Sequence, residues 1–98
     1  MITQIKNNDG VSLLKIEGDM TIYAAAELKH ELMNLIGVPG EYEIDLSGVV
    51  EIDTSGLQLL VLAKREAARL ENRLHFNRQS PAVLEVISLC NMAEYFAE

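Results

Sequence analysis

Two adjacent hydroxyl residues, Thr54 and Ser55, are the part of this chain best suited to chemistry. They follow Asp53 and precede Gly56, where an apolar segment gives way to a helical pattern. Aspartate is a favoured N-cap, so both hydroxyls are expected in the first turn of a helix, beside backbone N–H groups without helical partners. A surface hydroxyl there can accept a phosphoryl group, which adds about two negative charges. The same residues are also simply good helix starters.

The helix that Asp53 would begin is expected to run through about Leu70 and to separate apolar from polar side chains. Its leucines and alanines form one broad arc, and Gln58 lies on the opposite, polar arc. Leu62 falls among the polar residues, near the side that Ser55 reaches. A lone exposed leucine is ordinary on a protein surface, but here it is also a candidate docking contact.

Other chemistry has little support in the sequence. The only histidines are His30 and His75, and no serine lies in a Gly-x-Ser-x-Gly elbow. Neither histidine nor Cys90 has a neighbour at metal-ligand spacing, and no glycine-rich phosphate cradle is present. We therefore expect no catalytic residue, metal or cofactor, and an enzyme with a hidden triad is the least favoured alternative. Cys90 is interpreted as a small core residue on an apolar helix face.

Composition and charge limit the classes of molecule that this protein is expected to bind. Eight Lys and Arg against fifteen Asp and Glu give a net charge of −7, which disfavours binding to nucleic-acid phosphates. An acidic surface suits a basic protein partner, although it also serves solubility. The longest apolar run, Leu59–Ala63, is too short to span a membrane. With a single cysteine and no signal peptide in view, the sequence predicts a cytoplasmic protein without direct membrane insertion.

The elements that position the hydroxyls follow from periodicity and turn signals. Asn8-Asp9-Gly10 predicts a hairpin, Gly18 and Ser47-Gly48 are expected to end strands, and Gly37 is expected as a left-handed C-cap. Helices between strands favour crossover connections in a partly parallel sheet, so we expect one α/β domain over residues 1–98. The predicted strands are 3–7, 11–17, 41–46 and 74–77, and the predicted helices are 24–36, 54–70 and one opened by Ser80-Pro81, before a short final element at 92–96.

Five short motifs occur in an order and spacing that cover nearly the whole chain. They are Gly18-Asp-Met-Thr21, Ala26-Glu-Leu-Lys29, Ile44-Asp-Leu-Ser47, Asp53-Thr-Ser-Gly-Leu57 and Ser80-Pro81-Ala-Val. With them the sequence resembles a STAS domain, the fold of bacterial anti-sigma factor antagonists. The resemblance implies a small mixed sheet of four to five strands with helices packed mainly on one face.

The resemblance also implies a phosphorylation switch. Family antagonists bind an anti-sigma factor that is also a Ser/Thr kinase of histidine-kinase-like fold, and a PP2C-type phosphatase reverses the modification. The phosphoacceptor position matches Thr54, with Ser55 next best. The partner surface would comprise these two residues together with Asp53, Gly56, Thr21, Gln58 and Leu62. We expect a monomer when the protein is free.

A second function stays open from the same resemblance. Thr21 stands where the family tends to have aspartate, and a threonine at the position of Thr54 also occurs in STAS proteins outside sigma control. The alternative is an accessory subunit that binds the ATPase of an ABC-type phospholipid transporter. In that case Thr54 would be an interface residue.

Overall fold

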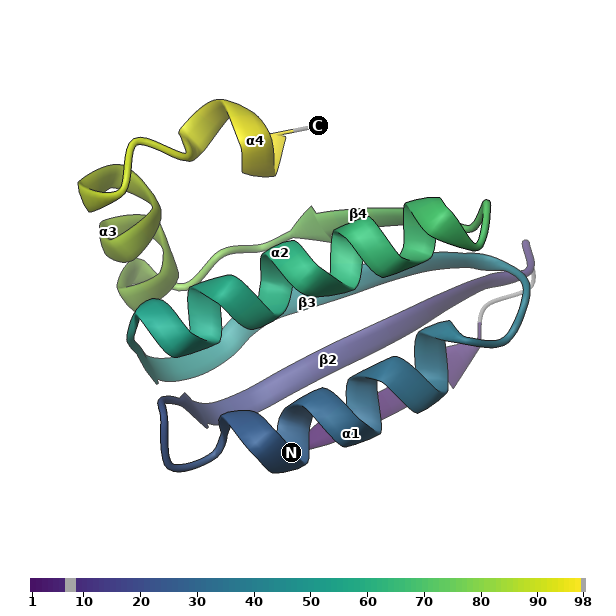
Figure 1. The fold of residues 1–98 in the computed structure, drawn as a ribbon, viewed down its shortest axis with the longest axis horizontal. Coiled ribbons are helices and arrows are strands. Elements are labelled where there is room, and N and C mark those ends of the chain that lie inside the picture. Colours follow the sequence, from purple (N-terminus) through teal and green to yellow (C-terminus); the bar gives the residue numbers. More distant parts are fainter. Residues whose placement is uncertain (7–8, 98) are drawn as a thin grey trace.

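Strands and helices follow one another in the order β-β-α-β-α-β-α-α in a computed structural model that describes residues 1–6 and 9–97 (Figure 1). The predicted order of elements is confirmed, and the turn expected at Asn8 lies outside the described residues. The strands are β1 (Ile2–Lys6), β2 (Val11–Met20), β3 (Glu41–Ile52) and β4 (Arg73–Asn77), and the helices are α1 (Ala25–Ile36), α2 (Thr54–Arg69), α3 (Pro81–Leu89) and α4 (Ala93–Ala97).

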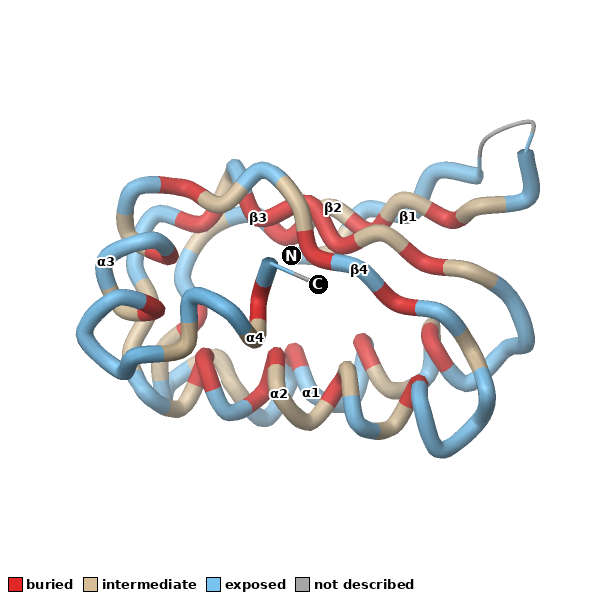
Figure 2. Tube along the Cα trace, turned by 90° about the horizontal axis from the view of Figure 1, so that it is seen from above, coloured by how far each residue is buried: buried red, intermediate tan, exposed pale blue. Residues whose placement is uncertain are grey.

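The sheet has the strand order β1-β2-β3-β4. β1 pairs with β2 antiparallel as a hairpin, whereas β2 with β3 and β3 with β4 are parallel. Parallel neighbours need crossover connections, and α1 and α2 supply them. Both helices lie side by side on one face of the sheet, while α3 lies at one end of it (Figure 2). The predicted mixed sheet with helices mainly on one face is confirmed.

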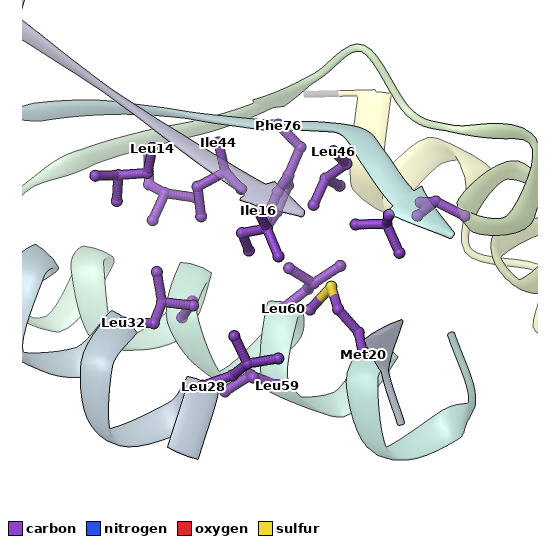
Figure 3. Close-up of a cluster of buried hydrophobic side chains, with 14 of the residues drawn as sticks. Leu14, Ile16, Met20, Leu28, Leu32, Ile44, Leu46, Leu59, Leu60 and Phe76 are labelled. Atoms are coloured by element: carbon purple, nitrogen blue, oxygen red, sulfur yellow. The ribbon is translucent and has the colours of Figure 1, made fainter. Parts of the chain in front are cut away.

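The core forms between this sheet face and the two crossover helices. Alternate strand residues such as Leu14, Ile16 and Ile44 point towards Leu32 and Leu60 of the helices, and all five are fully buried (Figure 3). Burying an aliphatic side chain of this size contributes about 1.5–3 kcal/mol. This apolar layer fixes where α2 lies on the sheet, and therefore where its first turn meets the end of β2.

Two glycines predicted to end strands lie inside them instead. Gly18 has φ +93° at a register shift between β2 and β3, so it forms an irregularity through which β2 continues to Met20. Gly48 lies within β3, where an added Cβ would be 2.8 Å from Glu17 Cγ on the neighbouring strand. Both glycines permit bulged pairing, which extends the strands to Met20 and Ile52, directly beside the candidate site.

Two predictions near helix ends are wrong, the left-handed conformation of Gly37 and the burial of Cys90. Gly37 is right-handed, with φ −71°, and its N–H donates to the Met33 carbonyl at 3.1 Å, so it continues the helical bonding. Left-handed residues follow the next two helices: Glu71 after α2 and Asn91 after α3. Because α3 ends in this turn, Cys90 is exposed, and the interpretation of Cys90 as a core residue was wrong.

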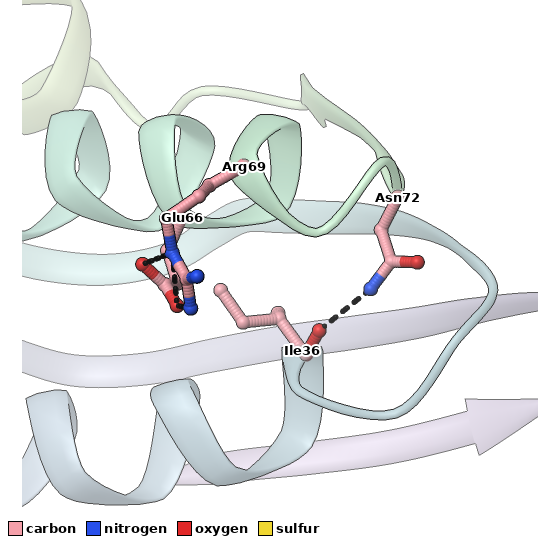
Figure 4. Close-up of polar contacts among 4 residues, drawn as sticks. All are labelled: Ile36, Glu66, Arg69 and Asn72. Atoms are coloured by element: carbon pink, nitrogen blue, oxygen red, sulfur yellow. Dashed lines mark hydrogen bonds and ion pairs between the residues drawn. The ribbon is translucent and has the colours of Figure 1, made fainter.

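A single amide ties the C-terminal end of α2 to the connection between α1 and β3. Asn72 Nδ2 donates to the Ile36 carbonyl at 2.9 Å and to the Val38 carbonyl at 3.3 Å, and its Oδ1 accepts from the Gly40 N–H at 3.2 Å. Figure 4 shows this bond to Ile36 beside the exposed Glu66–Arg69 ion pair on α2. Asn72 thus satisfies backbone groups at the end of α1.

Candidate functional site

The Asp53 carboxylate joins the start of α2 to the loop that follows β2. Its Oδ1 accepts from the N–H groups of Ser55 at 2.9 Å and Gly56 at 3.2 Å, which confirms the predicted N-cap. Its Oδ2 accepts from the Ile22 N–H at 2.9 Å. The bond from Ile22, followed by those from Gly56 and Ser55, holds the Asp53 pKa below its usual value. The carboxylate is therefore the charge form that this turn stabilises.

Gly56 is the residue that lets α2 approach the end of β2. A Cβ at this position would be 2.1 Å from the Met20 carbonyl oxygen and 2.8 Å from Ile52 Cγ1. No side chain fits that space, so glycine is required by close approach and not by an unusual φ. Gly56 is buried, so it lies behind the surface that the other predicted site residues form.

The two hydroxyl residues occupy different surroundings in the first turn. Thr54 is exposed at the first position of α2, directly after the N-cap residue Asp53. Ser55 is half-buried and lines a groove between α1 and α2. Thr54 is thus the more accessible of the two hydroxyl residues. An anion on its hydroxyl would lie at the positive end of the helix dipole, next to the Asp53 carboxylate.

The groove between α1 and α2 brings together three predicted site residues. The groove has a volume of about 300 Å³. Its α2 wall includes three residues at successive turns of the helix, Ser55, Gln58 and Leu62. Leu62 lines this groove with Ser55, on the side predicted for it, but it is half-buried and not the fully exposed leucine that was expected. The remaining lining residues are Ala25, Ala26 and Lys29 of α1 and Leu59 of α2.

The loop between β2 and α1 supplies apolar surface that the sequence analysis missed. Thr21 is half-buried, and its carbonyl accepts from the Ala24 and Ala25 N–H groups, both at 2.9 Å. The next two side chains are strongly exposed, Ile22 at 66% and Tyr23 at 95%. The signal available was a pair of large apolar residues in a segment without strand or helix periodicity. The Asp53–Ile22 hydrogen bond ties the backbone of this loop to the residue that precedes Thr54.

The described residues form neither a metal site nor a membrane-spanning helix. No group of three or more His, Cys, Asp or Glu side chains in residues 1–6 and 9–97 is arranged to hold a metal ion. In the same part of the chain, no helix is both long and apolar enough to cross a membrane. The two histidines lie apart and exposed, His30 on α1 and His75 on β4.

Known proteins resemble this chain over almost its full length. A family model described as "Mlab, STAS domain" matches residues 3–97. An anti-sigma factor antagonist from Mycobacterium paratuberculosis is 23% identical, with a TM-score of 0.81 over 98% of this chain and 83% of that one. A serine-to-glutamate variant of Moorella thermoacetica RsbS is 26% identical, with a TM-score of 0.70 over 94% of this chain and 77% of that one.

A third similar structure is that of a phosphorylated protein. The Bacillus cell fate determinant SpoIIAA in its phosphorylated form is 14% identical, with a TM-score of 0.70 over 97% of this chain and 87% of that one. At this identity the likeness concerns the fold. The fold expected from the five sequence motifs is therefore confirmed.

Proposed function

We propose, because this chain belongs to the STAS domain family, that it is a phosphorylation-switched protein-binding module that antagonises an anti-sigma factor with Ser/Thr kinase activity or a related signalling regulator. The observation that carries this proposal is an exposed hydroxyl, Thr54, beside an exposed apolar loop and a groove. A partner that covers Ile22, Tyr23 and the α1–α2 groove would also cover Thr54. Binding of this partner would then depend on whether the Thr54 hydroxyl is phosphorylated.

The cap geometry favours a switch that changes the surface without refolding the protein. Both oxygens of Asp53 already accept backbone N–H groups, from Ile22, Ser55 and Gly56, and none of these bonds uses the Thr54 side chain. A phosphate on Thr54 would leave this framework in place and add about two negative charges to a surface already acidic. Closing an interface over that dianion costs desolvation, and any facing carboxylate adds repulsion. Phosphorylation is therefore expected to release the partner.

The named relatives supply the rest of the proposal. Anti-sigma factor antagonists are among the similar structures, and one of them is described in unphosphorylated and phosphorylated forms. By this likeness we propose an anti-sigma factor/Ser-Thr kinase of histidine-kinase-like fold as the partner and a PP2C-type phosphatase as the reversing enzyme. The same likeness favours a cytoplasmic monomer that acts by binding and not by catalysis.

A paired affinity experiment tests the switch. Wild type, Thr54→Ala and Thr54→Glu serve as baits in a lysate of the native host, and retained proteins are identified by mass spectrometry. A kinase of the proposed fold should be retained by wild type and by Thr54→Ala, and lost with Thr54→Glu, because only that variant adds negative charge at the interface. Thr3→Glu places the same charge on an exposed threonine of β1 and should bind like wild type.

The outcomes separate the proposal from its alternative. If Thr54→Glu and Thr54→Ala both retain the kinase like wild type, the switch is wrong. Retention of an ATP-binding transporter subunit, insensitive to kinase treatment, would instead support the role in an ABC-type phospholipid transporter. Treating the isolated protein with the recovered kinase identifies the acceptor, since phosphate should be lost in Thr54→Ala and kept in Ser55→Ala.

A further inference from the structure

A second groove lies between the end of β3 and helix α3, and Thr54 is not among its lining residues. It encloses about 250 Å³, and it shares no lining residue with the groove between α1 and α2. Its wall is formed by two segments that are about thirty residues apart in sequence but packed together in the fold. The lining residues are Val50, Glu51 and Ile52 of β3 and Ala82, Glu85, Val86 and Leu89 of α3.

Two large apolar side chains that line this groove are strongly exposed. Val50 of β3 is 74% exposed and Leu89 of α3 is 76% exposed, although both are large aliphatic side chains. Single exposed leucines and valines are ordinary, but two from different elements that line one depression make a continuous apolar surface. Val86 and Ile52, which are half-buried, also line this groove. Covering this surface would remove apolar area from water.

The charged side chains that line this groove are both acidic. Glu51 and Glu85 are both exposed, and no lysine, arginine or histidine lines the groove. Asp19 of β2 is the cross-strand neighbour of Glu51, so two carboxylates project from adjacent strand positions, an arrangement that is destabilising when nothing neutralises it. None of the ion pairs found among the described residues includes these three acids. A cation placed here would relieve the repulsion.

We propose that this groove between β3 and α3 docks a basic amphipathic helix of a protein partner. The helix would place apolar anchors against Val50 and Leu89 and lysine or arginine side chains against Glu51 and Glu85. Helices that lie in apolar grooves present anchors one turn apart, with charged residues beside them. The charge of the groove and the net charge of −7 both select a positive segment over a neutral or acidic one.

This surface is separate from the one that Thr54 would control. A negative charge on Thr54 is expected to repel an acidic or closely fitting partner, but it cannot repel a basic helix in the second groove. Thr54→Glu should therefore leave binding at the β3–α3 groove unchanged or slightly stronger. The two proposals can fail independently, because they predict opposite responses to the same variant.

A designed peptide provides the probe. We would titrate the full chain with a fluorescein-labelled amphipathic peptide of about 14 leucine and lysine residues, a length at which a helix is marginal until it docks. Fluorescence anisotropy gives the affinity, and ¹H–¹⁵N chemical shifts give the place of binding. Shifts should concentrate on Val50, Val86 and Leu89, and a peptide with glutamate in place of lysine should not bind.

Matched variants separate specific docking from general attraction to an acidic protein. Glu51→Lys with Glu85→Lys should weaken binding at least about tenfold, whereas Glu31→Lys with Glu94→Lys, which change the net charge equally at exposed sites outside the groove, should weaken it less than about twofold. Leu89→Ser should also weaken binding, and Leu84→Ser, on the same helix but outside this groove, should not.

Several results would overturn the proposal. Equal weakening by the two charge-reversal pairs would mean that the peptide responds to net charge alone. Chemical shifts centred on Gln58 and Leu62 would place it in the α1–α2 groove. Concentration-dependent association of the chain, abolished by Leu89→Ser in sedimentation velocity, would show that a second copy covers the surface. Circular dichroism of each variant confirms that a loss of binding is not a loss of fold.

Discussion

The two ends of helix α2 are each held by one polar side chain, and they differ in what surrounds it. At the first end Asp53 accepts hydrogen bonds from three backbone N–H groups, those of Ile22, Ser55 and Gly56. At the other end Asn72 donates to two carbonyls and accepts from one N–H. In both places the side chain ties the helix to a connection that is distant in sequence. We call each of these hydrogen-bonding side chains, Asp53 and Asn72, a clamp. Because both ends of α2 have one, a clamp is a feature of the fold and not by itself a sign of function.

What distinguishes the two ends is charge and the residue beside the clamp. Asp53 is an anion at the positive end of the helix dipole, and it is followed by the exposed Thr54. Asn72 is neutral and follows Glu71, which is left-handed at φ 62° and closes the helix. The first end thus presents an accessible hydroxyl on a rigid turn, and the second presents the end of a helix. The proposed switch therefore depends on the Thr54 hydroxyl, whereas both clamps contribute to stability.

The largest effect is expected from the glycine that the first clamp holds. Gly56→Ala would place a Cβ 2.1 Å from the Met20 carbonyl, so α2 or β2 must shift, and we expect a loss of about 3 kcal/mol or more. Urea unfolding followed by circular dichroism measures the loss. Gly37→Ala, where the backbone is right-handed at φ −71° and exposed, should change stability by less than about 1 kcal/mol. Similar losses in the two variants would contradict the close approach.

The second clamp should contribute less, and only to stability. Asn72→Ala removes the partner of the Ile36 and Val38 carbonyls and of the Gly40 N–H, so we expect a loss of about 1–3 kcal/mol in urea unfolding. Binding of the proposed kinase should be unchanged once the protein is folded. The matched control is Asn34→Ala on the exposed side of α1, which loses only an exposed contact with His30, gains helix propensity and should not lower stability by more than about 0.5 kcal/mol. If Asn72→Ala abolished binding, the assignment of this end to stability would be wrong.

The same two ends show how far local sequence reasoning extends. The bonds that Asp53 accepts from Ser55 and Gly56 join residues two and three apart, so an aspartate before a helical pattern is enough to predict them. The bond to Ile22 spans 31 residues, and that from Asn72 to Ile36 spans 36. No local pattern encodes such contacts, because they exist only after the crossover helices pack on the sheet. The Asn72 clamp was accordingly missed.

Glycine was a second source of difference, for a related physical reason. Gly18 and Gly48 were interpreted as strand ends because glycine weakens strands locally. In the structure both permit bulged or close pairing between β2 and β3, which depends on the neighbouring strand. The exposed Tyr23 was also missed, since exposure in a loop depends on how Asp53 holds that loop. The fold class and the hydroxyl segment were predictable, whereas the contacts that surround the hydroxyls were not.

The smallest effect is a difference in pH dependence between the two clamps. Hydrogen bonds from Ile22, Gly56 and Ser55 lower the Asp53 pKa in the folded state below the value of about 3.9 expected in the unfolded chain. The stabilisation from this carboxylate is therefore fully present above about pH 4 and is lost as the pH falls through the folded pKa. Asp53→Asn lacks this titration, so the gap in unfolding free energy between wild type and this variant should narrow below about pH 4.

Asn72→Ala provides the contrast, because the amide does not titrate and its gap to wild type should stay constant over the same pH range. Burial acts to raise the pKa of Asp45, but hydrogen bonds from Ser47 and the positive charges of Arg78 and Lys15 together outweigh it and leave that pKa lowered as well. Asp45 is present in all three proteins, so its contribution cancels when gaps are compared. Urea unfolding at half-unit steps from about pH 7 to about pH 3 gives both gaps. A gap for Asp53→Asn that does not change with pH would mean that this end of α2 is held by hydrogen bonds alone, as the Asn72 end is, and that its charge has no part in stability.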